Sequence, residues 1–255
     1  MGDETPSYPS HLRPDPGTVE ILVERTDMNT RGEPASAPSG TRRVVLLRHA
    51  QTEENAAGRF LGRSDPGLDA LGADQCDRAS LRLASVFTTD HPHTVISSPA
   101  RRAVETAQRL GLRDPVIEAD IGEIDFGAWE GLTQAEVAEH DPVNFRAFSH
   151  GVIEGFPGGE TVGGVAARTV AVLEAHRPDS LVVVTHATVV RILVTALLGL
   201  PPSSYRSSFG RPGHLSWTEL EQHEGGWRLL TYDARSLTDG VDDAGAVPTP
   251  AAPAT

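Results

Sequence analysis

The stretch Val44-Val45-Leu46-Leu47-Arg48-His49 is a continuous apolar run that ends in two polar residues. A second, largely apolar run, residues 181–185, leads into His186, and a shorter one, residues 94–96, leads into Ser97. Continuous apolar runs of this length are typical of strands that helices cover on both faces. The three runs therefore predict a parallel β-sheet that has these polar residues at one edge.

Longer segments with helical periodicity alternate with these runs. From residue 43 onward, this alternation predicts an α/β fold, a mostly parallel sheet covered by helices on both faces. Near the C-terminus, residues 214–221 and 227–232 flank Gly225-Gly226 and predict an antiparallel hairpin at one edge of the sheet. The helices are expected at residues 70–87, 100–110, 160–176 and 188–198.

The two ends of the chain differ in composition from its middle. Residues 1–41 and 236–255 are polar and have too little apolar surface to offset the entropy lost on ordering. We expect a disordered N-terminal extension, with at most a short strand at residues 19–23, and a disordered acidic tail rich in Pro and Ala. The domain is expected at residues 42–235, about 190 residues, which is enough for one substantial core.

The charged residues exclude several classes of function. All 22 side chains counted as Lys or Arg are arginines, so neither a Schiff-base lysine nor a Walker-type phosphate loop is possible. The net charge of −13 argues against non-specific binding to nucleic acid or to anionic membranes. The single cysteine, the lack of an export or lipidation signal and the lack of a membrane-length apolar run predict a cytoplasmic location.

Polar residues at the strand ends point to a phosphoryl group as the ligand. The carboxyl ends of the strands line the ligand crevice of an open parallel sheet. We therefore expect Arg48, His49 and His186 to meet there, together with one of the adjacent Arg101 and Arg102. Arginine presents a planar fork of donors to phosphate oxygens, and a neutral imidazole nitrogen can attack phosphorus.

Four blocks follow one another in the order of a known signature set. They are residues 48–55 (RHAQTEEN), 97–107 (SSPARRAVETA), 123–131 (EIDFGAWEG) and 184–187 (VTHA). Together they resemble the histidine phosphatase superfamily, the phosphoglycerate mutase-like proteins. The resemblance covers about residues 43–235 and implies a phosphatase that needs neither a metal nor a cofactor and acts on a phosphorylated small molecule.

The resemblance also implies a role for each matching position. His49 corresponds to the nucleophile that becomes phosphohistidine. Arg48, Arg102 and His186 correspond to the residues that hold the phosphoryl oxygens. Glu123 corresponds to the acid that protonates the leaving oxygen and then activates water.

Four further residues are candidates for substrate binding. Thr52 and Asn55 are implied to line the same pocket. Arg59 and Arg63 either contact the substrate or form pairs at the surface, and the sequence leaves both possibilities open. Trp129 is expected to pack beneath the Glu123 loop rather than to stack on the substrate.

Two departures from the family pattern and two competing motifs need an interpretation. Ala50 and Ala187 stand where the family usually has glycine, so we expect backbone conformations there that accept a Cβ. Cys76 begins a Cys-x5-Arg pattern of cysteine-dependent phosphatases, but the stretch has no glycine and lies in a helical pattern, so we interpret it as coincidence. His91 and His93 have no evident third ligand, and we expect a loop there rather than a metal site.

The leading hypothesis is a phosphomonoesterase that acts as a monomer or a homodimer. The first alternative is a 2,3-bisphosphoglycerate-dependent phosphoglycerate mutase, and the second is a non-catalytic phosphate-binding protein. The segment between Glu123 and His186 is short, whereas the mutases of the family carry a longer insertion there. We expect a variable loop at residues 141–156 to select the substrate. Its candidate side chains are Phe145, Arg146, Phe148, His150 and Phe156.

Overall fold

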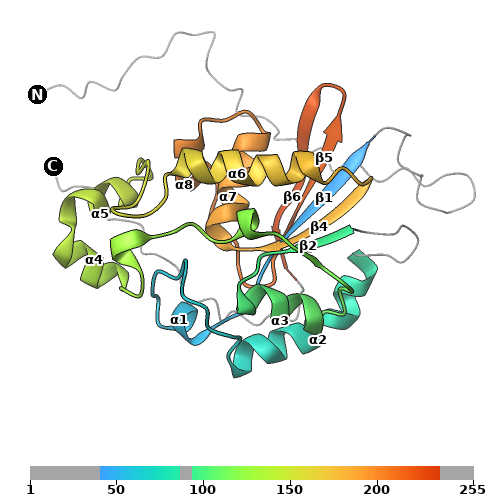
Figure 1. Cartoon of the computed structure of the whole chain (residues 1–255), viewed down its shortest axis with the longest axis horizontal. Coiled ribbons are helices and arrows are strands. Elements are labelled where there is room, and N and C mark those ends of the chain that lie inside the picture. The colour runs from blue at the N-terminus through green and yellow to red at the C-terminus, as the bar shows by residue number, and fades with distance from the viewer. Residues whose placement is uncertain (1–40, 87–93, 236–255) are drawn as a thin grey trace, which may run out of the picture. The chain divides into compact units, whose positions relative to one another are not determined.

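The computed structural model describes residues 41–86 and 94–235, and one mixed sheet lies at its centre (Figure 1). Its strand order is β3-β2-β4-β1-β5-β6. Neighbouring strands from β3 to β1 are parallel, and β5 and β6 add to the β1 edge in antiparallel orientation, which confirms the expected fold class. The strands are β1 (Arg42–Arg48), β2 (Thr94–Ser97), β3 (Val116–Ile117), β4 (Ser180–Thr185), β5 (Trp217–His223) and β6 (Gly226–Ala234).

Helices cover both faces of the sheet, with α2 and α3 on one side and α6 and α7 on the other (Figure 1). Side chains alternate along a strand, so β1 contributes to two cores. Leu47 packs with Cys76 of α2, and Leu46 packs with Val190 of α7. The α-helices of the described residues are α1 (Glu53–Ala56), α2 (Ala70–Val86), α3 (Arg101–Arg109), α4 (Gln134–His140), α5 (Pro142–Ser149), α6 (Val162–Ala175), α7 (Ala187–Leu197) and α8 (Tyr205–Ser208).

The strand register brings three strand ends together. Arg48 of β1 pairs with Thr185 of β4, and Ser97 of β2 pairs with Val184 of the same strand. His49 continues the β1 ladder, because its N–H donates to the Thr185 carbonyl at 3.0 Å. The residues that follow β1, β2 and β4 therefore lie beside one another at the carboxyl edge, as the apolar runs predict.

The expected hairpin and all four expected helices are present, with helix ends shifted by at most two residues. The first hairpin strand begins at Trp217 rather than at residue 214. Leu215 has a φ of 54°, which an extended strand does not allow. Residues 19–23 and the His91 and His93 pair lie outside the described residues.

The expectation of a loop at residues 141–156 is wrong, because α5 occupies most of its first half. Asp141 caps this helix by accepting from the Asn144 N–H, and Pro142 takes its first position, where a missing N–H costs nothing. Helix α4 begins with a capping box between Thr133 and Glu136. No helix in the part of the chain described here is long and apolar enough to cross a membrane.

Candidate active site

The His49 side chain is held in one neutral tautomer. Its side chain is 3% exposed, and Nδ1 lies 2.6 Å from the carbonyl oxygen of Ala50. Since a carbonyl only accepts hydrogen bonds, Nδ1 carries the proton and Nε2 keeps a free electron pair. Burial lowers the pKa of His49 well below its usual range, and the charges of Arg102 and Arg48 lower it further. The imidazole is therefore neutral at neutral pH.

His186 lies against His49, as the strand ends predict. It immediately precedes α7, is fully buried, and its ring centroid lies 5.1 Å from that of His49. Its Nε2 lies 2.8 Å from the Ser98 hydroxyl oxygen, and its Nδ1 is buried without a partner among the described residues. Burial, followed by the charge of Arg102, lowers the pKa of His186. The pocket therefore holds two neutral histidines beside positive charge.

Arg102 is the buried arginine of the adjacent pair, as expected. Its side chain is fully buried, whereas the Arg101 side chain is 65% exposed and pairs with Glu105 at the surface. Arg102 donates to the carbonyl oxygens of Ser64 at 2.8 Å and Gly62 at 3.2 Å. A guanidinium has five N–H donors. Two are used here, which leaves others for a phosphoryl group.

Arg48 is anchored by a histidine that the sequence analysis did not single out. The Arg48 side chain is 1% exposed and donates to the Pro212 carbonyl at 2.5 Å and to His214 Nε2 at 2.8 Å. Because a guanidinium only donates, His214 must accept with an unprotonated Nε2. Burial, and then the charge of Arg48, lowers the pKa of His214 well below its usual range. His214 is thus an acceptor that fixes the direction of Arg48.

The Glu123 side chain contacts the first turn of α7, the helix that begins directly after His186. Its carboxylate is 8% exposed and accepts from the backbone N–H of Ile124 at 2.9 Å and of Thr188 at 3.2 Å. Thr188 lies in the first turn of α7, where the helix dipole favours a negative charge. The fold therefore fixes the carboxylate of the implied set at the first turn of the helix that follows His186.

The four implied substrate-binding residues make local contacts. Thr52 is fully buried and caps α1 by accepting from the Asn55 N–H, while Asn55 Oδ1 is buried without a partner among the described residues. Arg59 pairs with Glu136, and Arg63 pairs with Asp125. The structure contains the surface pairs that were one of the two alternatives for these arginines, and their contact with substrate stays a prediction.

An aromatic cluster lies beneath the site. Trp129 is 1% exposed and packs against Phe60, Phe148 and Phe156, so its expected packing role is confirmed. Phe148 and Phe156 are each 5% exposed in the same cluster. Helix α5 turns Phe148 into this cluster, and the contribution of the two rings to substrate selection stays a prediction. Arg146 and His150 are exposed.

The two alanines that replace glycine cause no backbone strain. Neither Ala50 nor Ala187 has a positive φ. Both are buried, so the missing glycines leave tightly packed methyl groups next to the histidines rather than a distorted turn.

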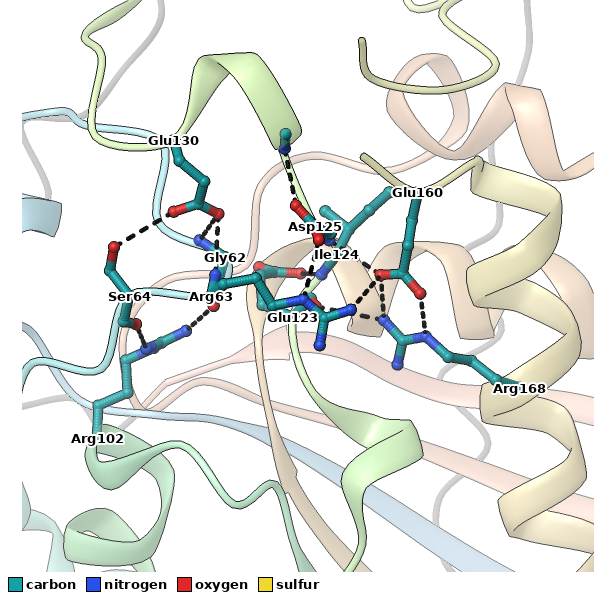
Figure 2. A network of polar contacts seen from close by, with 11 residues as sticks. Gly62, Arg63, Ser64, Arg102, Glu123, Ile124, Asp125, Glu130, Glu160 and Arg168 are labelled. Atoms are coloured by element: carbon teal, nitrogen blue, oxygen red, sulfur yellow. Dashed lines mark hydrogen bonds and ion pairs between the residues drawn. The ribbon is translucent and has the colours of Figure 1, made fainter. Parts of the chain in front are cut away.

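Figure 2 shows how the loop at residues 62–64 holds the Arg102 guanidinium through hydrogen bonds. On one side the loop presents two carbonyls to Arg102, and on the other it is held by Glu130. One Glu130 oxygen accepts from the N–H groups of Gly62 at 2.8 Å and Arg63 at 2.9 Å. A Cβ on Gly62 would lie 2.3 Å from that same oxygen, so only glycine allows this close approach.

Removing the Glu130 carboxylate should therefore weaken catalysis through Arg102. We expect Glu130→Ala to lower kcat/KM for a phosphomonoester on the order of 10-fold, the effect of losing charge-assisted hydrogen bonds that position a phosphate ligand. The measurement is steady-state hydrolysis together with inhibition by inorganic phosphate, which should weaken in parallel. Exposed Glu139 on α4 provides the matched control, and a Glu130→Ala protein as active as Glu139→Ala would contradict the role of the loop.

Cys76 is not a phosphatase nucleophile. It lies in the interior of α2, is fully buried, and burial raises the pKa of its thiol to about 12. A nucleophilic cysteine needs a thiolate at neutral pH. The Cys-x5-Arg pattern is therefore a helical segment, as interpreted from the sequence.

Cys76→Ser tests this directly. The variant should keep its activity within about twofold while losing about 1 to 3 kcal/mol of stability, because an apolar thiol is replaced by a hydroxyl in a core. Activity at a temperature well below the melting point and a thermal unfolding curve measure the two effects separately. Loss of turnover in a folded Cys76→Ser protein would show that the thiol takes part in the reaction.

An α/β sheet whose carboxyl edge gathers two histidines and two buried arginines is the arrangement of an enzyme that handles phosphoryl groups. The model of the histidine phosphatase superfamily (branch 1) matches residues 44–235. The chain belongs to this superfamily and is a phosphatase of the histidine phosphatase type.

Named relatives agree with this assignment. The glucosyl-3-phosphoglycerate phosphatase of Mycobacterium tuberculosis is 34% identical over 197 residues, which are 71% of this chain and 86% of the relative. Phosphoserine phosphatase 1 of Hydrogenobacter thermophilus is 37% identical over 177 residues, 65% of this chain and 80% of the relative. A solved structure of mycobacterial glucosyl-3-phosphoglycerate phosphatase complexed with VO3 is similar with a TM-score of 0.67 at 34% identity, covering 76% of this chain and 100% of that one.

Proposed function

We propose that this phosphatase is a metal-independent phosphomonoesterase that hydrolyses a small phosphorylated metabolite through a phosphohistidine at His49. One observation carries the proposal, the hydrogen bond from His49 Nδ1 to the Ala50 carbonyl at 2.6 Å. It leaves Nε2 unprotonated in a pocket with two buried arginines, Arg48 and Arg102. A neutral imidazole aimed into a cationic pocket suits attack on a phosphoryl group.

In the first step, Arg48, Arg102 and His186 hold the phosphoryl oxygens while His49 Nε2 attacks phosphorus. The bond between phosphorus and the alcohol oxygen breaks, and its electron pair goes to that oxygen. Protonated Glu123 gives its proton to the leaving oxygen, so that a neutral alcohol departs. The positive side chains balance the charge of the transferring group, which is the main requirement of phosphoryl transfer.

In the second step, water replaces the departed alcohol. The Glu123 carboxylate takes one proton from the water while the water oxygen attacks phosphorus. The bond between His49 Nε2 and phosphorus breaks, the electron pair returns to the imidazole, and inorganic phosphate leaves. Glu123 is then protonated and His49 is neutral, so both residues are ready for the next substrate.

The names of the relatives support a small phosphorylated metabolite as the substrate. Glucosyl-3-phosphoglycerate and phosphoserine are both phosphomonoesters of hydroxy acids. The short segment between Glu123 and His186 favours hydrolysis over the mutase alternative, because little chain is available to shield a phosphohistidine from water. The buried Glu123 carboxylate favours catalysis over pure phosphate binding, which needs no acid.

The test is product analysis with the purified protein. We expect hydrolysis of p-nitrophenyl phosphate in the presence of EDTA, and phosphate release from 3-phosphoglycerate that is faster than its isomerisation, even with 2,3-bisphosphoglycerate added. Loss of activity in EDTA that added metal restores would overturn metal independence. Isomerisation much faster than phosphate release would establish the mutase. Phosphate binding without turnover of a panel of phosphorylated metabolites would establish the binding protein.

A further inference from the structure

A second cluster of buried positive charge lies beside the proposed catalytic site. It consists of Arg191 on α7 and Tyr205 and Arg206 on α8. Arg191 is 6% exposed, and its guanidinium carbon lies 5.1 Å from the centroid of the fully buried Tyr205 ring. The Arg206 guanidinium carbon lies 3.7 Å from the centroid of the Phe148 ring. The Tyr205 ring of α8 thus contacts the guanidinium of α7, and the Phe148 ring of α5 contacts the guanidinium of α8.

Three buried polar atoms of this cluster have no hydrogen-bond partner within the described residues. Arg191 Nε, Arg206 Nε and the Tyr205 hydroxyl are all buried without a hydrogen-bond partner there, and neither guanidinium pairs with a carboxylate in that part of the chain. Buried cations are normally paired, because desolvation without compensation is costly. Burial and the neighbouring Arg191 lower the pKa of Arg206 to about 10, which reflects this crowding of positive charge. The cation–π contacts with Tyr205 and Phe148 offset part of this cost, and a bound anion would offset more.

The cluster lies near Glu123, one helical turn further along α7. Thr188, whose N–H holds Glu123, and Arg191 are three residues apart on α7 and share one face of the helix. The rise between them is about 4.5 Å. Burial raises the pKa of Tyr205, the charges of Arg191 and Arg206 lower it, and the charge of Glu123 raises it, so Glu123 and the cluster are close enough to interact.

This placement determines which part of a substrate reaches the cluster. In the proposed reaction the leaving oxygen lies opposite His49 across the phosphorus and must reach Glu123 to receive its proton. The alcohol carbon chain starts at this oxygen, one turn of α7 from Arg191. Each guanidinium offers a planar fork of donors, which suits the two oxygens of a carboxylate, and the phenol adds a hydroxyl donor.

We propose that Arg191, Tyr205 and Arg206 bind a carboxylate on the alcohol part of the substrate. The enzyme then acts on phosphorylated hydroxy acids in preference to phosphorylated sugars or polyols. This inference rests on the proposed phosphomonoesterase function and specifies the class of its substrate.

Matched substrates test the proposal on the unmodified protein. 3-Phosphoglycerate and glycerol phosphate of the same configuration differ only in a carboxylate in place of a hydroxymethyl group, and phosphoserine and phosphoethanolamine differ only in the presence of the carboxylate. We expect the carboxylate member of at least one pair to have a kcat/KM higher on the order of 10- to 100-fold, the effect of one or two charge-assisted hydrogen bonds. Equal kcat/KM values within both pairs would overturn the inference.

Two variants assign the preference to the cluster. Arg191→Met and Arg206→Met keep side-chain volume but remove the charge, and each should reduce kcat/KM for the carboxylate substrate on the order of 10-fold more than for its matched partner. Arg78→Met on the exposed face of α2 is the control and should change neither value. An equal loss of kcat/KM for the carboxylate substrate and its matched partner in folded variants would overturn the role of the cluster.

The same assays separate this inference from the function on which it rests. If the unmodified protein hydrolyses p-nitrophenyl phosphate but shows no carboxylate preference, only the inference fails. If it hydrolyses no phosphomonoester, the proposed function fails and the inference with it. Should a variant fail to fold in thermal unfolding, the comparison of matched substrates on the unmodified protein still decides the question.

Discussion

His49→Ala should abolish nearly all turnover, with kcat lower by on the order of 10⁴-fold or more, because removing the nucleophile disables the whole catalytic unit. The loss should not come from unfolding. Among the described residues, the His49 ring hydrogen-bonds only to the carbonyl of the next residue, and the backbone N–H of position 49 stays in the ladder with Thr185 after the substitution. A melting temperature close to that of the unmodified protein is therefore part of the expected result.

The covalent intermediate gives this prediction a second readout. A radioactive phosphomonoester mixed rapidly with the unmodified enzyme should leave label on His49 that is stable in base and lost in acid, so the quench must avoid acid. The His49→Ala protein should carry no such label, whereas Cys76→Ser should carry as much as the unmodified enzyme. Substantial turnover by folded His49→Ala, or label on a different residue, would contradict the phosphohistidine mechanism.

The parts of the fold that the sequence predicts are those with strong local periodicity. Strands β1 and β4 are covered on both faces, so their central positions are all apolar and each run is visible without knowledge of its neighbours. Strand β3 has only two residues, and α1 and α8 have four each, which is too short for any period to appear. Helices α4 and α5 do carry capping signals, and these could have been recognised.

The residues of the candidate site that directly follow strands were predictable from the sequence. His49 and His186 follow apolar runs, and parallel topology alone brings them together. His214 was not predictable in this way, because it meets Arg48 only through the antiparallel pairing of β5 with β1, which a local pattern does not specify. Arg191 did leave a signal, as a single charge in an otherwise apolar helix that the sheet and α6 bury. A lone arginine in such a helix needs a partner and deserves a search for an anion.

Glu123→Gln should slow phosphorylation of His49 by an amount that depends on the leaving group. For phosphoserine or glycerol phosphate, whose alkoxides are poor leaving groups, the loss of a general acid should reduce the rate on the order of 10²- to 10⁴-fold. p-Nitrophenolate departs with little protonation, so the phosphorylation rate with its ester should fall much less. The fold should tolerate the change, because the amide oxygen can still accept from the Thr188 or the Ile124 N–H.

The measurement must isolate the first chemical step, since Glu123 is also the proposed base for hydrolysis of the phosphohistidine. Its loss in that second step should slow turnover of every substrate. Rapid mixing of enzyme with each ester, followed by quantitation of released alcohol in the first turnover, gives the phosphorylation rate alone. Glu139→Gln, at an exposed position of α4, provides the matched control and should leave both rates unchanged. An equal first-turnover loss for the two esters in Glu123→Gln would mean that this carboxylate positions the phosphoryl group and does not protonate the leaving oxygen.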